Sequence, residues 1–216
     1  MISPSIFILL AEQSNLIDKI TRLVIQKSFD WLSNSPQLSS DFHLSINLSA
    51  LDLQQKELIP FINQQLEEYQ LDASQIAFEL TESAVMQDQQ LFLQVIAEIH
   101  QLGFIIAIDD FGTGYSSLRY LQQINADIIK IDMSFVRDIH HSLINQKIAD
   151  AIIKMAASTG AYTVAEGIES QAELDVLQSL GTRMVQGYLT GKPTPADKFI
   201  SEFMALRPLK PNSEIN

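Results

Sequence analysis

The chain has 216 residues, 46% of them hydrophobic, which is enough for one globular domain with a sizeable core. Its 26 acidic and 14 basic residues give a formal net charge of −12, which argues against binding to nucleic-acid polymers or to membrane surfaces. It has no cysteine, which excludes disulfides, thiolate zinc sites and a cysteine nucleophile.

The first forty residues predict two helices and no targeting or membrane segment. The N-terminus lacks the basic region of a signal peptide, and its apolar run at 6–11 is too short to cross a bilayer. We therefore expect a cytoplasmic protein. A first helix is predicted at 6–14, because Pro4 suits a first helical turn, and a second at 18–32.

From residue 43 onward, predicted strands and helices alternate. The six predicted strands are 43–48, 76–81, 104–108, 127–131, 162–166 and 183–188. The predicted helices are 51–69 with a bend at Pro60, 91–102, 118–124, 146–159, one that begins at the Ser170/Glu173 capping pattern, and 196–206. This alternation indicates βα units around a parallel sheet. We expect residues 1–206 to form one domain and the polar tail, 207–216, to be disordered.

Asp109 and Asp110 follow an apolar strand within the stretch IIAIDDFGTGYSS and precede a glycine-containing loop. Adjacent carboxylates at the end of a buried strand repel each other and lose hydration, so a metal ion or a lysine between them is expected. The alternative is an aspartate pair that caps a helix and contacts a surface lysine.

A polar residue marks the end of every predicted strand. In chain order these residues are Asn47, Glu79, Asp109 with Asp110, Lys130, Glu166 and Gln186. In a βα barrel the strand ends share one face, which holds the active site. Each residue also has a simpler explanation, since Asn47 could cap a helix, Glu79 could pair with Lys130, and Gln186 could satisfy a backbone carbonyl. The recurrence in all strands favours a functional site.

The residue types at these ends indicate the chemistry. Hard oxygen donors, which favour Mg²⁺ or Mn²⁺, are Asn47, Glu79, Asp109 and Asp110. No histidine lies at a predicted strand end, so a histidine-rich zinc centre is not expected. Lys130 could hold a substrate phosphate or orient a water, and Glu166 is a candidate base. Together they suit in-line attack on a phosphodiester.

Several stretches closely resemble the EAL-domain family. They are SPSIFILLAEQSNLI, SINLSA, FELTES, AIDDFGTGYSSLRYL, IIKIDMSFV, VAEGIES and VQGYLTGKP, which span nearly the whole chain in the family's order. The resemblance implies a bacterial phosphodiesterase that cuts cyclic di-GMP to linear pGpG. It also implies a modified TIM barrel with two Mg²⁺ or Mn²⁺ ions.

The resemblance further implies a set of metal ligands. Asn47, Glu79 and Asp109 match ligands of the first ion, with Asp109 shared by the second. Asp110 matches a ligand of the second ion and is also counted among the substrate-binding residues.

The remaining candidate residues match catalytic and substrate positions of the family. Lys130 resembles the residue that positions the attacking water, and Glu166 resembles its base or a partner of the second metal. Glu82 and Glu169 resemble residues that brace the catalytic loop and site, and Gln186 resembles one that lines the substrate site.

The chain departs from the family at its start, because the Glu-Ala-Leu motif is absent. In the family this motif lies on a strand shortly before the segment that matches 3–17. We therefore expect an incomplete TIM-type (β/α) barrel with about six of eight strands, lacking one metal-ligand Glu and a nearby substrate-binding Arg. This predicts impaired activity, and a homodimer or a partner that supplies the missing strands.

Two other functions stay open from the sequence. One is a non-catalytic regulatory module that binds cyclic di-GMP or a partner protein, which the missing Glu favours. The other is a metal-dependent barrel of another class, such as an enolase-like lyase, which also uses carboxylates and a lysine at strand ends. The DDFGTGYSS block disfavours the lyase.

Overall fold

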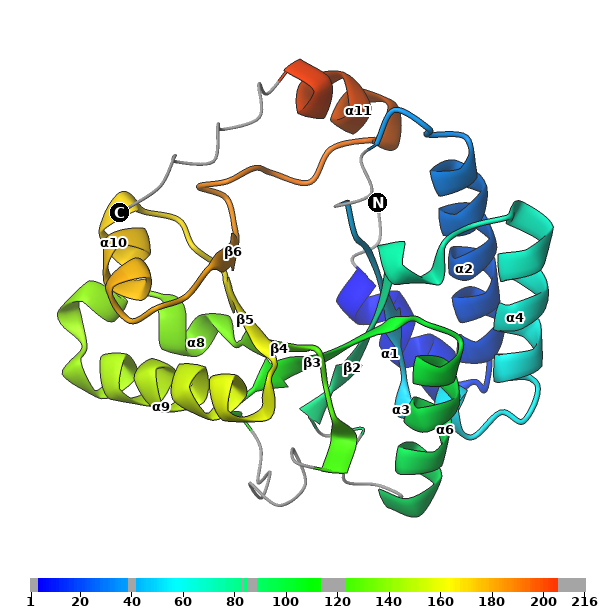
Figure 1. Ribbon diagram of the computed structural model, residues 1–216, viewed down its shortest axis with the longest axis horizontal. Helices are drawn as coiled ribbons and strands as arrows, with labels where there is room; N and C mark the ends of the chain where they lie inside the picture. Colours follow the sequence, from blue (N-terminus) through cyan, green and yellow to red (C-terminus); the bar gives the residue numbers. More distant parts are fainter. Residues whose placement is uncertain (1–3, 39–41, 83, 85–88, 114–122, 206–216) are drawn as a thin grey trace.

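The computed structural model describes residues 4–38, 42–82, 84, 89–113 and 123–205. Its sheet has six parallel strands: β1 (Leu44–Leu48), β2 (Ile76–Thr81), β3 (Ile105–Phe111), β4 (Ile128–Ile131), β5 (Tyr162–Glu166) and β6 (Met184–Gln186). Each strand pairs with the one before it in the chain. The sheet curls into an incomplete barrel with helices outside it (Figure 1), which confirms the predicted TIM-type α/β fold.

Most helices lie around the outside of the curled sheet, and the C-terminal helix lies apart from the strands (Figure 1). The helices are α1 (Pro4–Gln13), α2 (Ile17–Ser33), α3 (Ala50–Leu53), α4 (Leu58–Tyr69), α6 (Gln89–Gln101), α8 (Met133–Val136), α9 (Leu143–Thr159), α10 (Gln171–Ser179) and α11 (Ala196–Ala205), with 3-10 turns η1 (Ala73–Gln75) and η2 (Ile139–His141). Among the described residues no helix has the length and apolar character to span a membrane.

The predicted helix at 51–69 is wrong in one respect, because two helices, α3 and α4, occupy this stretch. Ser49 and Asp52 form a capping box that begins α3. Pro60 lies in the first turn of α4, where its missing N–H leaves no helical hydrogen bond unmade. The predicted disordered tail and residues 118–122 of the predicted helix at 118–124 lie outside the described residues.

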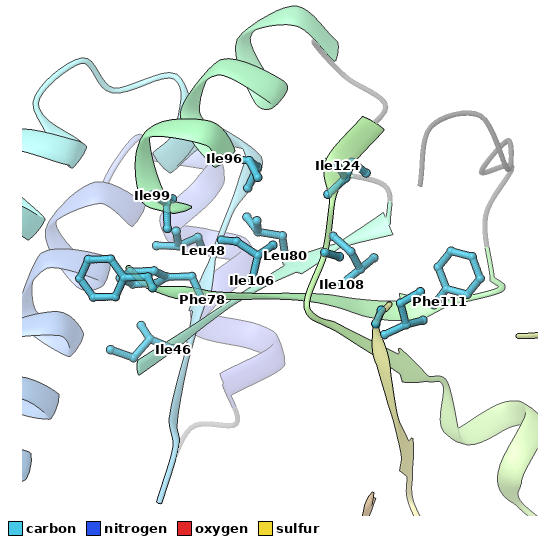
Figure 2. Packing of buried hydrophobic residues seen from close by; sticks show 14 of the residues in the cluster. Ile46, Leu48, Phe78, Leu80, Ile96, Ile99, Ile106, Ile108, Phe111 and Ile124 are labelled. Atoms are coloured by element: carbon cyan, nitrogen blue, oxygen red, sulfur yellow. The ribbon is translucent and has the colours of Figure 1, made fainter. Parts of the chain in front are cut away.

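The strand register sorts side chains onto two faces of the sheet, because successive residues of a strand point to opposite sides. The outer face carries buried apolar residues, such as Phe78 of β2 and Ile106 of β3, which pack with Ile96 and Ile99 of α6 (Figure 2). This contact between sheet and helices forms the hydrophobic core.

The inner face carries the polar residues. Register pairs place Asn47 beside Glu79 and Glu166 beside Gln186. Large side chains on this face are also exposed to solvent: Tyr162 is 56% exposed and Met184 is 39% exposed. The interior of a closed barrel is filled by side chains, so the exposure agrees with an open barrel.

An aromatic cluster links α11 to α2 and to the segment before β1. Ring centroids of Trp31 in α2, Phe42 before β1 and Phe199 in α11 lie 6.0 to 6.3 Å apart in all three pairs. Such pairs contribute about 0.5–1.5 kcal/mol each beyond the apolar area that they bury. We call these three residues the aromatic clasp, since they hold the C-terminal helix against α2.

Candidate metal and catalytic site

The centre of the inner face is the ammonium group of Lys130, whose side chain is 6% exposed. Its Nζ lies 2.7 Å from Glu166 Oε1, 2.8 Å from Glu79 Oε2 and 3.2 Å from Asp109 Oδ1. These carboxylates come from β5, β2 and β3, so the site exists only when the parallel strands are paired in this register.

A β-bulge places Asp109 and Asp110 together. Ile108 pairs with Ile129 and Phe111 pairs with Ile131, so β3 holds one more residue here than β4. Asp110 has a left-handed backbone conformation at this bulge, with φ 54°. Its N–H donates a hydrogen bond to Asp109 Oδ1 at 2.9 Å. The predicted strand at 104–108 is therefore too short, because β3 continues through both aspartates to Phe111.

The site carries more negative than positive charge. Burial raises the pKa of the Asp110 carboxyl, and the neighbouring carboxylates of Asp109 and Asp132 raise it further. Burial likewise raises the pKa of Glu166, although the Lys130 ammonium opposes this shift. Burial alone would lower the pKa of Lys130, but Glu79 and Glu166 outweigh it and raise that pKa, so Lys130 stays charged.

The geometry fits a divalent cation. Carboxylate oxygens of Asp109, Asp110 and Glu166 all lie within 4.8 Å of one another, so they could hold one ion together. Oxygen ligands and excess negative charge are what hard cations such as Mg²⁺ and Mn²⁺ require. The predicted ligand Glu79 is linked to this cluster by its ion pair with Lys130.

Two predicted residues, Asn47 and Gln186, lie on the strands at either side of the cluster. Asn47 is exposed on β1 beside Glu79 and lines a cavity of about 600 Å³ under α1 and α2. Gln186 is exposed on β6 beside Glu166 and lines a separate cavity of about 750 Å³ with Tyr188 and Lys192.

The two residues expected to brace the site have different surroundings. Glu82, 2% exposed, accepts a hydrogen bond at 2.9 Å from the N–H of Gly112, directly after β3. Glu169 contacts Arg137, with 3.0 Å between Oε1 and Nη2. Arg137 was not predicted, because it follows α8, a four-residue helix that the sequence did not indicate.

A curled parallel sheet with carboxylates and one central lysine on its inner face defines a TIM-type α/β domain with a candidate metal centre. A family model described as "EAL domain" matches residues 1–193. The chain therefore belongs to the EAL-domain family, as the sequence motifs indicated.

Curated relatives agree with this family. The cyclic di-GMP phosphodiesterase PdeB of Shewanella oneidensis is 34% identical over 94% of this chain, and PdeR of Escherichia coli is 37% identical over 92%. The chain spans only 24% and 30% of the lengths of these two proteins.

Solved structures agree with the fold. The PaMucR phosphodiesterase in complex with c-di-GMP superposes with a TM-score of 0.87 at 34% identity, covering 92% of this chain and 87% of that one. The EAL domain of Mycobacterium smegmatis DcpA gives a TM-score of 0.84 at 29% identity, covering 89% of this chain and 87% of that one.

Proposed function

We propose that this chain binds cyclic di-GMP and hydrolyses one phosphodiester bond to give linear pGpG, with Mg²⁺ or Mn²⁺ at the inner-face carboxylates. The observation that carries the proposal is the Lys130 cluster with Glu79, Asp109 and Glu166. It is supported by relatives that are named cyclic di-GMP phosphodiesterases.

The proposed metal ligands are Asn47, Glu79, Asp109 and Asp110, with Glu166 beside them. When bound, divalent cations would lower the pKa of water and offset the charge on the phosphate. A net charge of −12 opposes an anionic nucleotide, so binding should depend on these cations.

Lys130 and Glu166 have the proposed catalytic roles. Lys130 orients the attacking water and the phosphate, and Glu166 accepts the proton of that water. The water oxygen bonds to phosphorus, the bond from phosphorus to the leaving ester oxygen breaks, and that oxygen takes up a proton. Gln186 and the cavity beside it would contact the nucleotide.

A second candidate, which rests on the sheet edges, is a regulatory module that binds cyclic di-GMP or a protein partner without turnover. Within the described strands, β1 and β6 each pair on one side only. A second copy or another protein could add strands there.

The cytoplasmic location stays a prediction.

A phosphodiesterase assay separates the two candidates. We expect Mn²⁺-dependent conversion of cyclic di-GMP to pGpG, with no turnover of GTP or cyclic AMP, and a loss of about a hundredfold or more in Asp109→Asn and Glu166→Gln. Asp72→Asn, a carboxylate at the start of η1, is the control and should keep full activity.

Nucleotide binding without turnover would favour the regulatory module. The absence of both would reject the proposed function.

A further inference from the structure

Glu173 is a buried carboxylate that the proposed reaction does not use. It is 4% exposed and lies in the first turn of α10. Its Oε1 accepts a hydrogen bond from the N–H of Asp138, and its Oε2 accepts from the N–H groups of Glu169 and Ser170, each at 2.9 Å. Burial alone would raise the pKa of Glu173, but these N–H groups outweigh it and lower the pKa, so the group is a charged acceptor.

These hydrogen bonds join the two segments that follow the catalytic strands. The segment from Asp132 to Asp138 follows β4, which carries Lys130. The segment from Gly167 to Ser170 follows β5, which ends at Glu166. The two segments also touch directly, because a Cβ added to Gly167 would lie 2.6 Å from Met133 Cβ.

A second link between these segments is weaker. Arg137 and Glu169 form an ion pair at 3.0 Å, but their side chains are 54% and 51% exposed. Exposed pairs contribute about 0–1 kcal/mol, so the buried carboxylate of Glu173 is the main polar connection.

We propose that Glu173 is a positioning residue that fixes the segment after β5 against the segment after β4, and so sets Glu166 and Glu169 relative to Lys130. This inference rests on the proposed function, since it assigns a role within the same site. A group misplaced by about 1 Å can cost about a hundredfold in rate, so a link of this kind can matter without contacting substrate.

Two substitutions separate positioning from helix capping. In Glu173→Gln the amide oxygen can still accept from Glu169 and Ser170, because glutamine serves in a capping box, but its NH₂ would face the N–H of Asp138. Ser170→Ala does the reverse. It removes the Ser170 hydroxyl, which in the wild type accepts a hydrogen bond from the N–H of Glu173 at 3.4 Å. The hydrogen bond from the N–H of Asp138 to the Glu173 carboxylate stays in place.

The test measures kcat and KM for cyclic di-GMP at a temperature where both variants are fully folded. We expect Glu173→Gln to lower kcat by about tenfold or more while KM stays within about twofold, and Ser170→Ala to keep the wild-type kcat. Equal kcat values for the two variants would overturn the proposal, because Glu173 would then act only through the helix.

Mn²⁺ affinity, measured by calorimetry, provides a readout that does not need turnover. We expect Glu173→Gln to weaken Mn²⁺ binding several-fold and Ser170→Ala to leave it unchanged, because Glu166 lies in the carboxylate cluster. This pattern in a chain without turnover would support positioning and reject the proposed function. A wild-type chain that neither binds Mn²⁺ nor turns over would overturn both.

Discussion

Lys130 is the residue on which the charge balance of the inner face depends. Lys130→Met would leave the carboxylates of Glu79, Asp109 and Glu166 without their ammonium partner. Removing one partner from a buried ionic cluster costs about 3–5 kcal/mol, so we expect a loss of that size in the free energy of unfolding in EDTA. Mn²⁺ should restore part of the loss, since it supplies positive charge to the same oxygens.

Lys154→Met is the matched control, because Lys154 is 74% exposed and pairs with Asp150 one helical turn away. Its loss should cost less than about 0.5 kcal/mol in denaturant titrations. Equal losses in the two variants would contradict a buried ionic cluster.

The lowered pKa of Glu173 predicts how stability depends on pH. Ionised Glu173 stabilises the fold above the pKa that it has in the unfolded chain, close to its ordinary value of 4.5. As the pH falls through the lower pKa of the folded state, that contribution is lost. The difference in unfolding free energy between wild type and Glu173→Gln should therefore be constant near neutral pH and shrink below about pH 4.5.

Urea titrations from pH 7 to pH 3 measure this difference. Ser170→Ala, which changes no titratable group, should differ from wild type by a constant amount. A Glu173→Gln difference that also stays constant would show that the carboxylate has the same pKa in both states.

Single residues were partly predictable, because an apolar strand rarely ends in a charged side chain without a reason. The sequence indicated Glu79, Asp109, Lys130 and Glu166, and the structure brings them together. Only one of the two contacts that define the proposed role of Glu173 could be predicted from the sequence. Its capping box with Ser170 follows from a four-residue pattern, but its bond to Asp138 depends on how two distant segments pack.

At the scale of elements, the turn between β5 and α10 depends on Gly167. Its φ is +71°, a conformation that side chains rarely adopt, and an added Cβ would lie 2.6 Å from Met133 Cβ. For Gly167→Ala we expect about 1–2 kcal/mol from backbone strain and about 1–3 kcal/mol from overpacking against α8.

Gly160→Ala is the control, since Gly160 has φ +82° with no atom within 4 Å of the added Cβ. In thermal or chemical unfolding, Gly160→Ala should lose only the contribution of backbone strain, about 1–2 kcal/mol. A Gly160→Ala loss as large as that of Gly167→Ala would mean that contact with Met133 contributes nothing.

Local sequence patterns predicted the bounds of an element well where turn or capping residues marked both of its ends. The strands at 76–81 and 162–166 have the predicted bounds, since an apolar run lies between turn or capping residues. The β3 bulge was not predictable, because it depends on the register of β3 against β4. The break between α3 and α4 was missed, because the four residues between them, 54–57, are Gln, Gln, Lys and Glu, which are good helix formers and give no signal for a helix end.

At the scale of the whole molecule, the edge of β1 that pairs with no other described strand predicts self-association. Edge strands present unpaired backbone groups to other chains, and a lysine on such an edge disfavours pairing. Ser45 is exposed on the inner face of β1, so Ser45→Lys should raise the monomer fraction in sedimentation experiments across a concentration series.

Ser158→Lys, which adds the same charge at an exposed position of α9, is the control. It should leave the association unchanged. If both variants shift the equilibrium equally, net charge and not the β1 edge governs association.

The number of strands followed from the sequence, but the contact between α2 and α11 did not. Trp31 and Phe199 are separated by most of the chain, and no local pattern links them. Their contact needs the curvature of the whole sheet, which arises from the twist of successive strand pairs.

The order of strands in the sheet has a consequence for synthesis on the ribosome. Because β1 to β6 lie side by side in chain order, each new strand finds its pairing edge already made, and the sheet can grow from the N-terminus as the chain emerges. The aromatic clasp is the exception, since Trp31 and Phe42 must wait for Phe199 in α11. In a nascent chain Trp31 and Phe42 can therefore contact each other, but they lack their contacts with Phe199 until α11 has been synthesised.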